Sequence, residues 1–173
     1  MEKKDAMKSI TFILSGSLLM IFNAIGDNWR VVLLALFGII LMFIGLGKLK
    51  KVLDKHGKSA MTFLVVALVI YALGCIFDLV PLVGSLVANV FFLLAFIAQL
   101  IGFFLLRSSV TIGKSGKSGV LLLMVAMVFG IIASIIGMIP LMGLVSSIFG
   151  LIAIIFVFFG WVGIQDGLGE ANE

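Results

Sequence analysis

Charged residues are scarce in this chain of 173 residues. Lysine, arginine, aspartate and glutamate together make up 12% of the sequence, whereas a soluble domain carries about 25%. Apolar residues make up 63%, compared with about 45–50% in soluble domains. This composition predicts a polytopic membrane protein with almost no mass outside the bilayer.

The side chains that most often carry chemistry are also scarce. Cys75 is the only cysteine and lies in an apolar run, which excludes a disulfide within the chain and a metal cluster built on thiolates. His56 is the only histidine. The sequence contains no Ser–His–Asp set, no HExxH motif and no GxSxG motif. We therefore expect no enzymatic activity, no cofactor and no metal.

Six apolar segments are long enough, or nearly so, to cross the hydrocarbon core of a bilayer, which takes about twenty helical residues. They lie at about 9–25, 30–47, 60–79, 84–106, 119–138 and 143–164. Each run is continuously apolar, without the alternation that the wall of a β-barrel needs. The predicted fold class is an all-α integral membrane protein with six transmembrane helices.

A repeat organises these helices. The motif at 57–59, Gly-Lys-Ser, recurs at 116–118, and the turn at 81–84, Pro-Leu-Val-Gly, is matched at 140–143 by Pro-Leu-Met-Gly. A weaker copy precedes both. We expect a single transmembrane domain over 1–173, built from three parallel-repeat helical hairpins at 9–47, 60–106 and 119–164, with basic linkers at 48–59 and 107–118.

The distribution of basic residues predicts the orientation. Arg30 would lie on one side of the membrane, and the remaining eleven of the twelve basic residues on the other: Lys3, Lys4, Lys8, Lys48, Lys50, Lys51, Lys55, Lys58, Arg107, Lys114 and Lys117. Because basic residues are retained in the cytoplasm during insertion, both termini are expected to be cytoplasmic. The pattern resembles small bacterial membrane proteins built from duplicated hairpins. It implies a multi-pass protein of the inner membrane and carries no activity.

Small residues recur along the second helix of each hairpin at a spacing that places them on one side. They are Gly38 and Gly45, then Ala88, Ala95 and Gly102, then Ser146, Ala153 and Gly160. Small residues let helix backbones approach in lipid, which predicts that the second helices form a close-packed centre. The alternative is that glycine and alanine are common in membrane helices and that duplication copied them.

Four polar residues of the middle hairpin have apolar or glycine counterparts in the next repeat: Tyr71, Asp78, Asn89 and Gln99. Hydrogen bonds between helices are the favoured interpretation, with water or a turn hydrogen bond favoured for Asp78, near the end of its helix. If the protein has a solute site, these four residues are the candidates.

The Gly-Lys-Ser motifs do not fit a phosphate-binding loop, because Val52 and Thr111 stand where that loop needs glycine. Ser59 and Ser118 are instead expected to be N-caps. Contact with lipid headgroups is expected for the linker lysines, which are Lys48, Lys50, Lys51, Lys55, Lys58, Lys114 and Lys117. Trp29 and Trp161 lie near opposite helix ends and are typical of interfacial anchors.

Two functions remain open. The first is a non-catalytic scaffold, accessory subunit or oligomeric assembly unit of the inner membrane, which the scarcity of intramembrane ionisable groups favours. The second is a small-solute or ion transporter or channel that works as an oligomer. The expected partners are membrane lipid together with further copies of the chain or another membrane protein, and nucleic acid is not expected.

Overall fold

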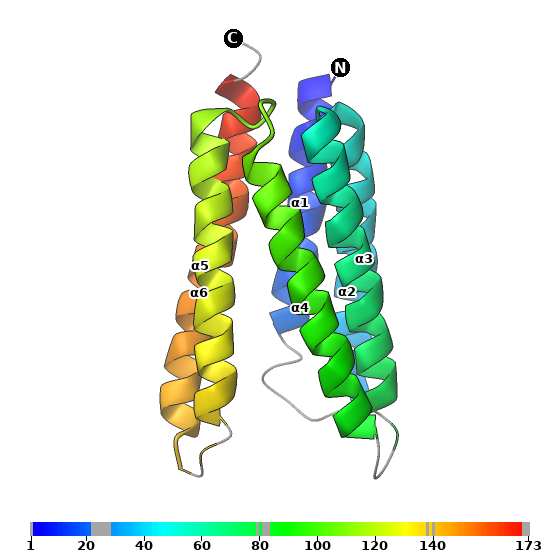
Figure 1. Cartoon of the computed structure of the whole chain (residues 1–173), viewed down its shortest axis with the longest axis vertical. Helices are drawn as coiled ribbons and strands as arrows, with labels where there is room; N and C mark the ends of the chain where they lie inside the picture. Colours follow the sequence, from blue (N-terminus) through cyan, green and yellow to red (C-terminus); the bar gives the residue numbers. More distant parts are fainter. Residues whose placement is uncertain are drawn as a thin grey trace. The chain divides into compact units, whose positions relative to one another are not determined.

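A computed structural model describes residues 2–21, 29–78, 80, 84–137, 139 and 141–170. These residues form six α-helices (Figure 1) and, within the described ranges, no strand. The helices are α1 (Glu2–Ile21), α2 (Trp29–Val52), α3 (Lys55–Asp78), α4 (Gly84–Arg107), α5 (Gly113–Gly137) and α6 (Gly143–Glu170). The predicted all-α class is confirmed.

Four of these helices are long and apolar enough to cross a membrane, in the segments Lys55–Phe77, Val87–Arg107, Gly113–Ala133 and Gly143–Glu170. At a rise of 1.5 Å per residue, segments of 21 to 28 residues are long enough to span the hydrocarbon core, which is about 30 Å thick. Among the described residues, these four helices are the ones that meet both requirements. A crossing by α1 and α2 stays a prediction.

Both predicted linkers are shorter than expected, because the helices continue beyond the apolar runs. Only residues 53 and 54 separate α2 from α3, and residues 108–112 separate α4 from α5. The prediction that Ser59 is an N-cap is wrong, because α3 begins at Lys55 and the Ser59 hydroxyl donates to the Lys55 carbonyl within the helix. Ser118 likewise lies inside α5. Lysine favours helix, so the basic segments prolong the helices.

The chain divides into two compact units, Met1–Thr111 and Ile112–Glu173. In the first unit, α1 packs on α2 and α3 on α4, and a smaller contact joins α2 to α3. In the second unit, α5 packs along α6. The organisation into a single domain stays a prediction.

One packing arrangement occurs in all three helix pairs. A glycine of the second helix lies against the backbone of a small residue of the first helix and against the aliphatic side chain four residues further on. The three sets are Gly45 on Ser9 and Ile13, Gly102 on Ala60 and Leu64, and Gly160 on Gly119 and Leu123. A Cβ atom added at these glycines would lie between 2.7 and 3.3 Å from the carbonyl oxygen of the small residue. We call this arrangement the glycine contact.

Aromatic rings pack against one another in the other half of the second and third helix pairs. Phe77 of α3 stacks on Phe91 of α4, with ring centroids 5.2 Å apart. In the second unit, Phe129 of α5 lies 5.8 Å from Phe149 and 5.5 Å from Phe156, both on α6. Each of these pairs therefore joins small residues at the glycine contact to large rings further along.

Two smaller predictions concern the tryptophan anchors and the turn at 140–143. Trp161 is only 3% exposed, so its assignment as an interfacial anchor is wrong; the side chain of Trp29 lies outside the described residues. At the turn predicted for 140–143, the Met142 N–H donates to the Ile139 carbonyl at 3.2 Å, and Leu141 has φ of 69°. That φ lies in the left-handed region favoured by glycine. Pro140, like 81–83 of the earlier turn, lies outside the described residues.

The glycine contact predicts that a large side chain at Gly160 destabilises the protein. Gly160→Leu places atoms against the Gly119 backbone, which cannot rotate away, so we expect a loss of about 1–3 kcal/mol. Gly150→Leu, on the same helix, is the matched control because a Cβ atom there meets nothing within 4 Å. Thermal unfolding of the full chain in detergent measures both variants, and equal transition temperatures would contradict the contact.

Candidate functional site

The predicted polar membrane residues are spread along α3 and α4. Tyr71 is half-buried, and its ring lies 5.1 Å from that of Phe92 on α4. Asn89 is exposed and Gln99 is half-buried. Ten residues of helix separate these two amides by about 15 Å, which is too far for one small solute to contact both. Asp78 is the last residue of α3, and its side chain lies outside the described residues.

The small residues join each second helix to the first helix of its own pair. Most of the predicted set is buried, and Ser146 and Ala153 are half-buried. The Ser146 hydroxyl donates to the Ala133 carbonyl across α5 and α6, at 2.8 Å. In the first unit, no Cα atom of the described residues of α2 lies within 8 Å of one of α4. The close approach in that unit therefore lies within the pairs and not between second helices.

A carboxylate accepts several hydrogen bonds at the lysine-rich end of the first unit. Asp54 caps α3, because its Oδ1 accepts a hydrogen bond from the Gly57 N–H at 3.0 Å. The same oxygen accepts from the buried Ser109 hydroxyl, and Oδ2 accepts from the Val110 N–H at 3.4 Å. The Asp54 N–H in turn donates to the Thr111 hydroxyl at 3.1 Å. One residue therefore ties the start of α3 to the chain that follows α4.

This environment stabilises the ionised form of Asp54. Burial alone raises the pKa of the carboxyl group. The hydrogen bonds from Ser109, Gly57 and Val110, with the nearby His56, outweigh burial and hold the pKa below its ordinary value of 3.8. A negative charge at a helix N-terminus also interacts favourably with the helix dipole. Asp54 is thus a fixed anion among lysines.

In the second unit, the carboxylate that caps the first helix of the pair belongs to the second helix. Glu170, at the end of α6, accepts hydrogen bonds from the N–H groups of Lys114 and Ser115 at 3.0 and 3.1 Å, and from the Ser115 hydroxyl. It therefore caps the first turn of α5 from across the pair. Gly113 opens that turn with φ of 58°, a conformation that glycine adopts without strain.

The glycines of the two Gly-Lys-Ser motifs have a packing role that the motif search did not detect. A Cβ atom at Gly57 would lie 2.7 Å from the Cβ of Leu53, and one at Gly116 would lie 2.7 Å from the Cβ of Ile112. Both aliphatic residues are buried. The sequence contains a usable signal, since each glycine follows a large aliphatic residue by four positions. Asp54 was also detectable, as an acid directly preceding a helical segment.

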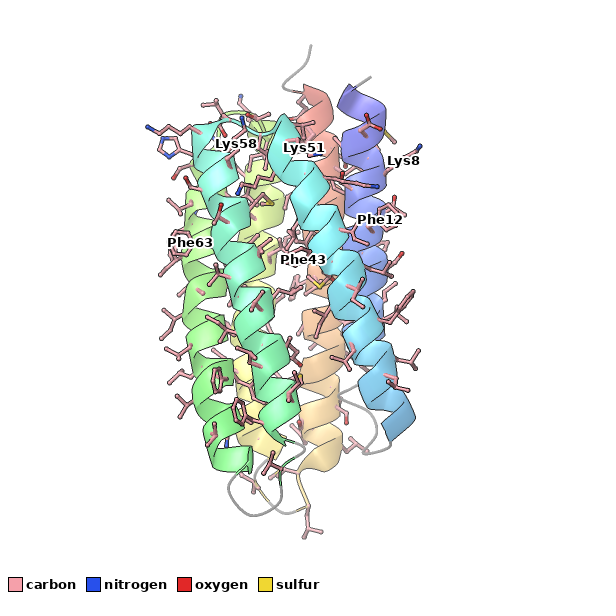
Figure 2. All side chains as sticks on the ribbon, turned by 90° about the vertical axis from the view of Figure 1, so that its right-hand side faces the viewer. Lys8, Phe12, Phe43, Lys51, Lys58 and Phe63 are labelled. Carbon is pink, nitrogen blue, oxygen red and sulfur yellow. The ribbon has the colours of Figure 1, made fainter. Side chains whose placement is uncertain are left out.

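The predicted headgroup lysines lie on the surface at helix ends. Lys50 is half-buried, and the exposed members are Lys48, Lys51, Lys55, Lys58, Lys114 and Lys117. Figure 2 shows Lys8, Lys51 and Lys58 at one end of the first unit, with Phe12, Phe43 and Phe63 further along the helices. The Lys48 ammonium lies 4.6 Å from the centre of the Phe12 ring, within the range of a cation–π interaction.

No protein-family model, curated protein or solved structure shows significant similarity to this chain. The groups described above are therefore interpreted from their own geometry and chemistry.

The capping role of Asp54 predicts a pH-dependent contribution to stability. Asp54→Ala removes the cap of α3 and should cost about 0.5–2 kcal/mol at neutral pH. Because the pKa is lower in the folded chain than the roughly 3.9 of an unfolded one, this contribution is complete above that value. It is lost as the pH falls through the folded pKa.

Thermal unfolding in detergent across this pH range measures the effect of Asp54. The difference between wild type and Asp54→Asn should shrink as the medium is acidified. Asp5→Asn, which neutralises an exposed acid of the same unit, should show no comparable change. A difference in transition temperature that is the same at every pH would show that ionisation of the Asp54 carboxyl group does not contribute to stability.

The cap supplied by Glu170 predicts local fraying when it is removed. Glu170→Ala should accelerate hydrogen exchange at the Lys114 and Ser115 amides, because both lose their acceptor. Asp166→Ala, which removes an exposed acid one turn earlier on α6, should leave those amides protected. Exchange at residues 113–118 that is the same in both variants would exclude the cap.

Proposed function

We propose that this chain is a multi-pass protein of the bacterial inner membrane that acts as a non-catalytic scaffold, accessory subunit or oligomeric assembly unit. Six helices cross the bilayer as three hairpins repeated in the same orientation, with both termini in the cytoplasm. The four helices that are long and apolar enough to span a membrane are the starting point of this proposal.

Two recurring contacts support the three-hairpin repeat. The glycine contact occurs once in each helix pair, always between the late part of the second helix and the early part of the first. The packing of Gly57 on Leu53 recurs 59 residues later as Gly116 on Ile112. The second of these contacts recurs at the period of the sequence repeat, as expected when each copy folds in the same way.

The position of the lysines supports the orientation. In the first unit, the end of α2 and the start of α3 carry exposed lysines, and Lys114 and Lys117 occupy the first turns of α5. A hairpin that enters and leaves on the lysine side places both chain ends in the cytoplasm.

The observation that carries the scaffold proposal is the apolar character of the helix pairs, both between the paired helices and on their outward-facing surface. The buried residues are mostly aliphatic or small, such as Leu64 on α3, Ala95 on α4 and Leu123 on α5, together with the aromatic Phe103 and Trp161. In the described part of the chain, Ser9 and Ser109 are the buried polar side chains, and both donate hydrogen bonds. The outward residues are also large and apolar, so the outer face suits lipid or another membrane protein.

The transporter alternative draws on one observation, the half-buried positions of Tyr71 and Gln99 in the middle helix pair. A solute path would need water beside these residues. The two functions therefore differ in whether the contact between α3 and α4 is dry.

Thiol accessibility separates the two functions. In a Cys75→Ser background, Ala60→Cys, Ala95→Cys and Ala126→Cys each place a thiol at a buried position of the helix pairs. The scaffold proposal predicts that all three resist a small charged methanethiosulfonate reagent in native membranes. Labelling of Ala60 and Ala95 positions at the rate of an exposed thiol would favour a water-filled path.

Two exposed positions serve as controls and report the orientation. Leu141→Cys, at the turn between α5 and α6, should react with a membrane-impermeant maleimide in intact cells whose outer membrane has been opened. Ser118→Cys, on the lysine side, should react only after the inner membrane is permeabilised. The reverse pattern would refute cytoplasmic termini.

A further inference from the structure

The corner between α2 and α3 concentrates positive charge on a small surface. Residues 48–58 contain five lysines and His56, against a single acid, Asp54. Both oxygens of that acid accept hydrogen bonds from Ser109, Gly57 and Val110. The carboxylate is thereby directed at the protein's own backbone and hydroxyl groups, which leaves the lysines to attract an external anion.

The corner presents these lysines from fixed positions. Helix extends to Val52 on one side and starts again at Lys55 on the other. Between them Leu53 is buried, and Gly57 lies against it closely enough that a Cβ atom would clash. The exposed lysines come in pairs three residues apart, a spacing that places each pair on one side of its helix. They are Lys48 and Lys51 on α2, and Lys55 and Lys58 on α3.

Apolar rings lie further along the same helices. Phe43 on α2 and Phe63 on α3 are both exposed, and Figure 2 shows them further from the basic end than Lys51 and Lys58. At 1.5 Å per helical residue, Phe63 lies about 8 Å beyond Lys58, and Phe43 about 12 Å beyond Lys51. This sequence of charge and then apolar surface matches a phospholipid, whose phosphate lies above its acyl chains.

We propose that the basic corner, defined by Lys48, Lys51, Lys55 and Lys58, is a binding surface for anionic phospholipid headgroups, with Phe43 and Phe63 alongside the acyl chains. The proposal rests on the proposed function only in placing the corner at the cytoplasmic leaflet. Lysines near an anionic leaflet each gain on the order of 1 kcal/mol, so clustered lysines bind such lipids well above the affinity of a single one. A corner whose backbone is fixed also loses little backbone entropy on binding.

The test compares the stabilisation of the full chain by anionic and zwitterionic lipid. Purified protein in detergent is titrated with phosphatidylglycerol or phosphatidylcholine, and the transition temperature is followed. We expect phosphatidylglycerol to stabilise wild type more strongly. The triple variant Lys51→Gln, Lys55→Gln, Lys58→Gln should lose affinity on the order of a hundredfold, at about fivefold per lysine.

A matched variant removes the same charge elsewhere. Arg107→Gln, Lys114→Gln, Lys117→Gln carries the same change in net charge and should keep most of the stabilisation, because those residues are spread over a longer connection. Equal losses in the two triple variants would show attraction to net charge and overturn the corner as a site. If the corner variant does not fold, Lys55→Gln and Lys58→Gln should each weaken binding about fivefold, and unchanged binding in both would overturn the proposal.

Two further arms identify the source of the anion. Inorganic phosphate in phosphatidylcholine should not reproduce the stabilisation, and if it does, the corner binds free anions and the lipid proposal fails. Thiol accessibility of Ala60→Cys and Ala95→Cys is measured on the same corner variant. Loss of lipid stabilisation while these thiols stay protected supports the corner, whereas exposed thiols with lipid stabilisation intact would count against the scaffold and not against the corner.

Discussion

The close approach of helix backbones at glycine is the interaction on which the rest of this structure depends. Lipid tails are as apolar as leucine, so burying leucine between helices gains little in a membrane, and packing has to supply the attraction. Gly45, Gly102 and Gly160 supply it by bringing the second helix of each pair against a backbone carbonyl of the first. The same contact occurs in all three pairs, and the large rings of the second and third pairs pack further along the helices. The contact therefore sets which helices pair and where their backbones approach.

The helix termini must in addition satisfy their exposed backbone groups. The two units do this with carboxylates from different places. Asp54 caps α3 from the residue before the helix, and its own N–H is accepted by Thr111. At the positions 59 residues further on, the sequence has Gly113 and Glu170, and Glu170 now caps α5. In both units a carboxylate therefore caps the first helix of the pair, although it comes from a different position in each unit. Both carboxylates accept hydrogen bonds within the protein.

Much of the fold could be predicted from the sequence, because runs of about twenty apolar residues have few alternatives to helix in a membrane. Six helices were expected and six are observed. The ends were less predictable: Ser59 and Ser118 looked like caps because they precede the apolar runs, but lysine is compatible with helix and Asp54 starts α3 earlier. The small residues on α2, α4 and α6 were recognised, but spacing alone does not say which helix they face. The partner of Gly160 is Gly119, and only the three-dimensional register reveals it. The polar residues Tyr71, Asn89 and Gln99 do not form one site. The ten residues between Asn89 and Gln99 are already visible in the sequence, whereas the packing of the Tyr71 ring near Phe92 depends on how α3 and α4 pair.

We propose that three helix pairs, each held together at its glycine contact, form the membrane-embedded body of this protein. A structure determined in a lipid bilayer at native stoichiometry tests it most directly. We expect six membrane-crossing helices, with Gly45, Gly102 and Gly160 each packed on the first helix of its pair and no ordered water between the paired helices. A continuous water-filled path along α3 and α4, lined by Tyr71 and Gln99, would contradict it.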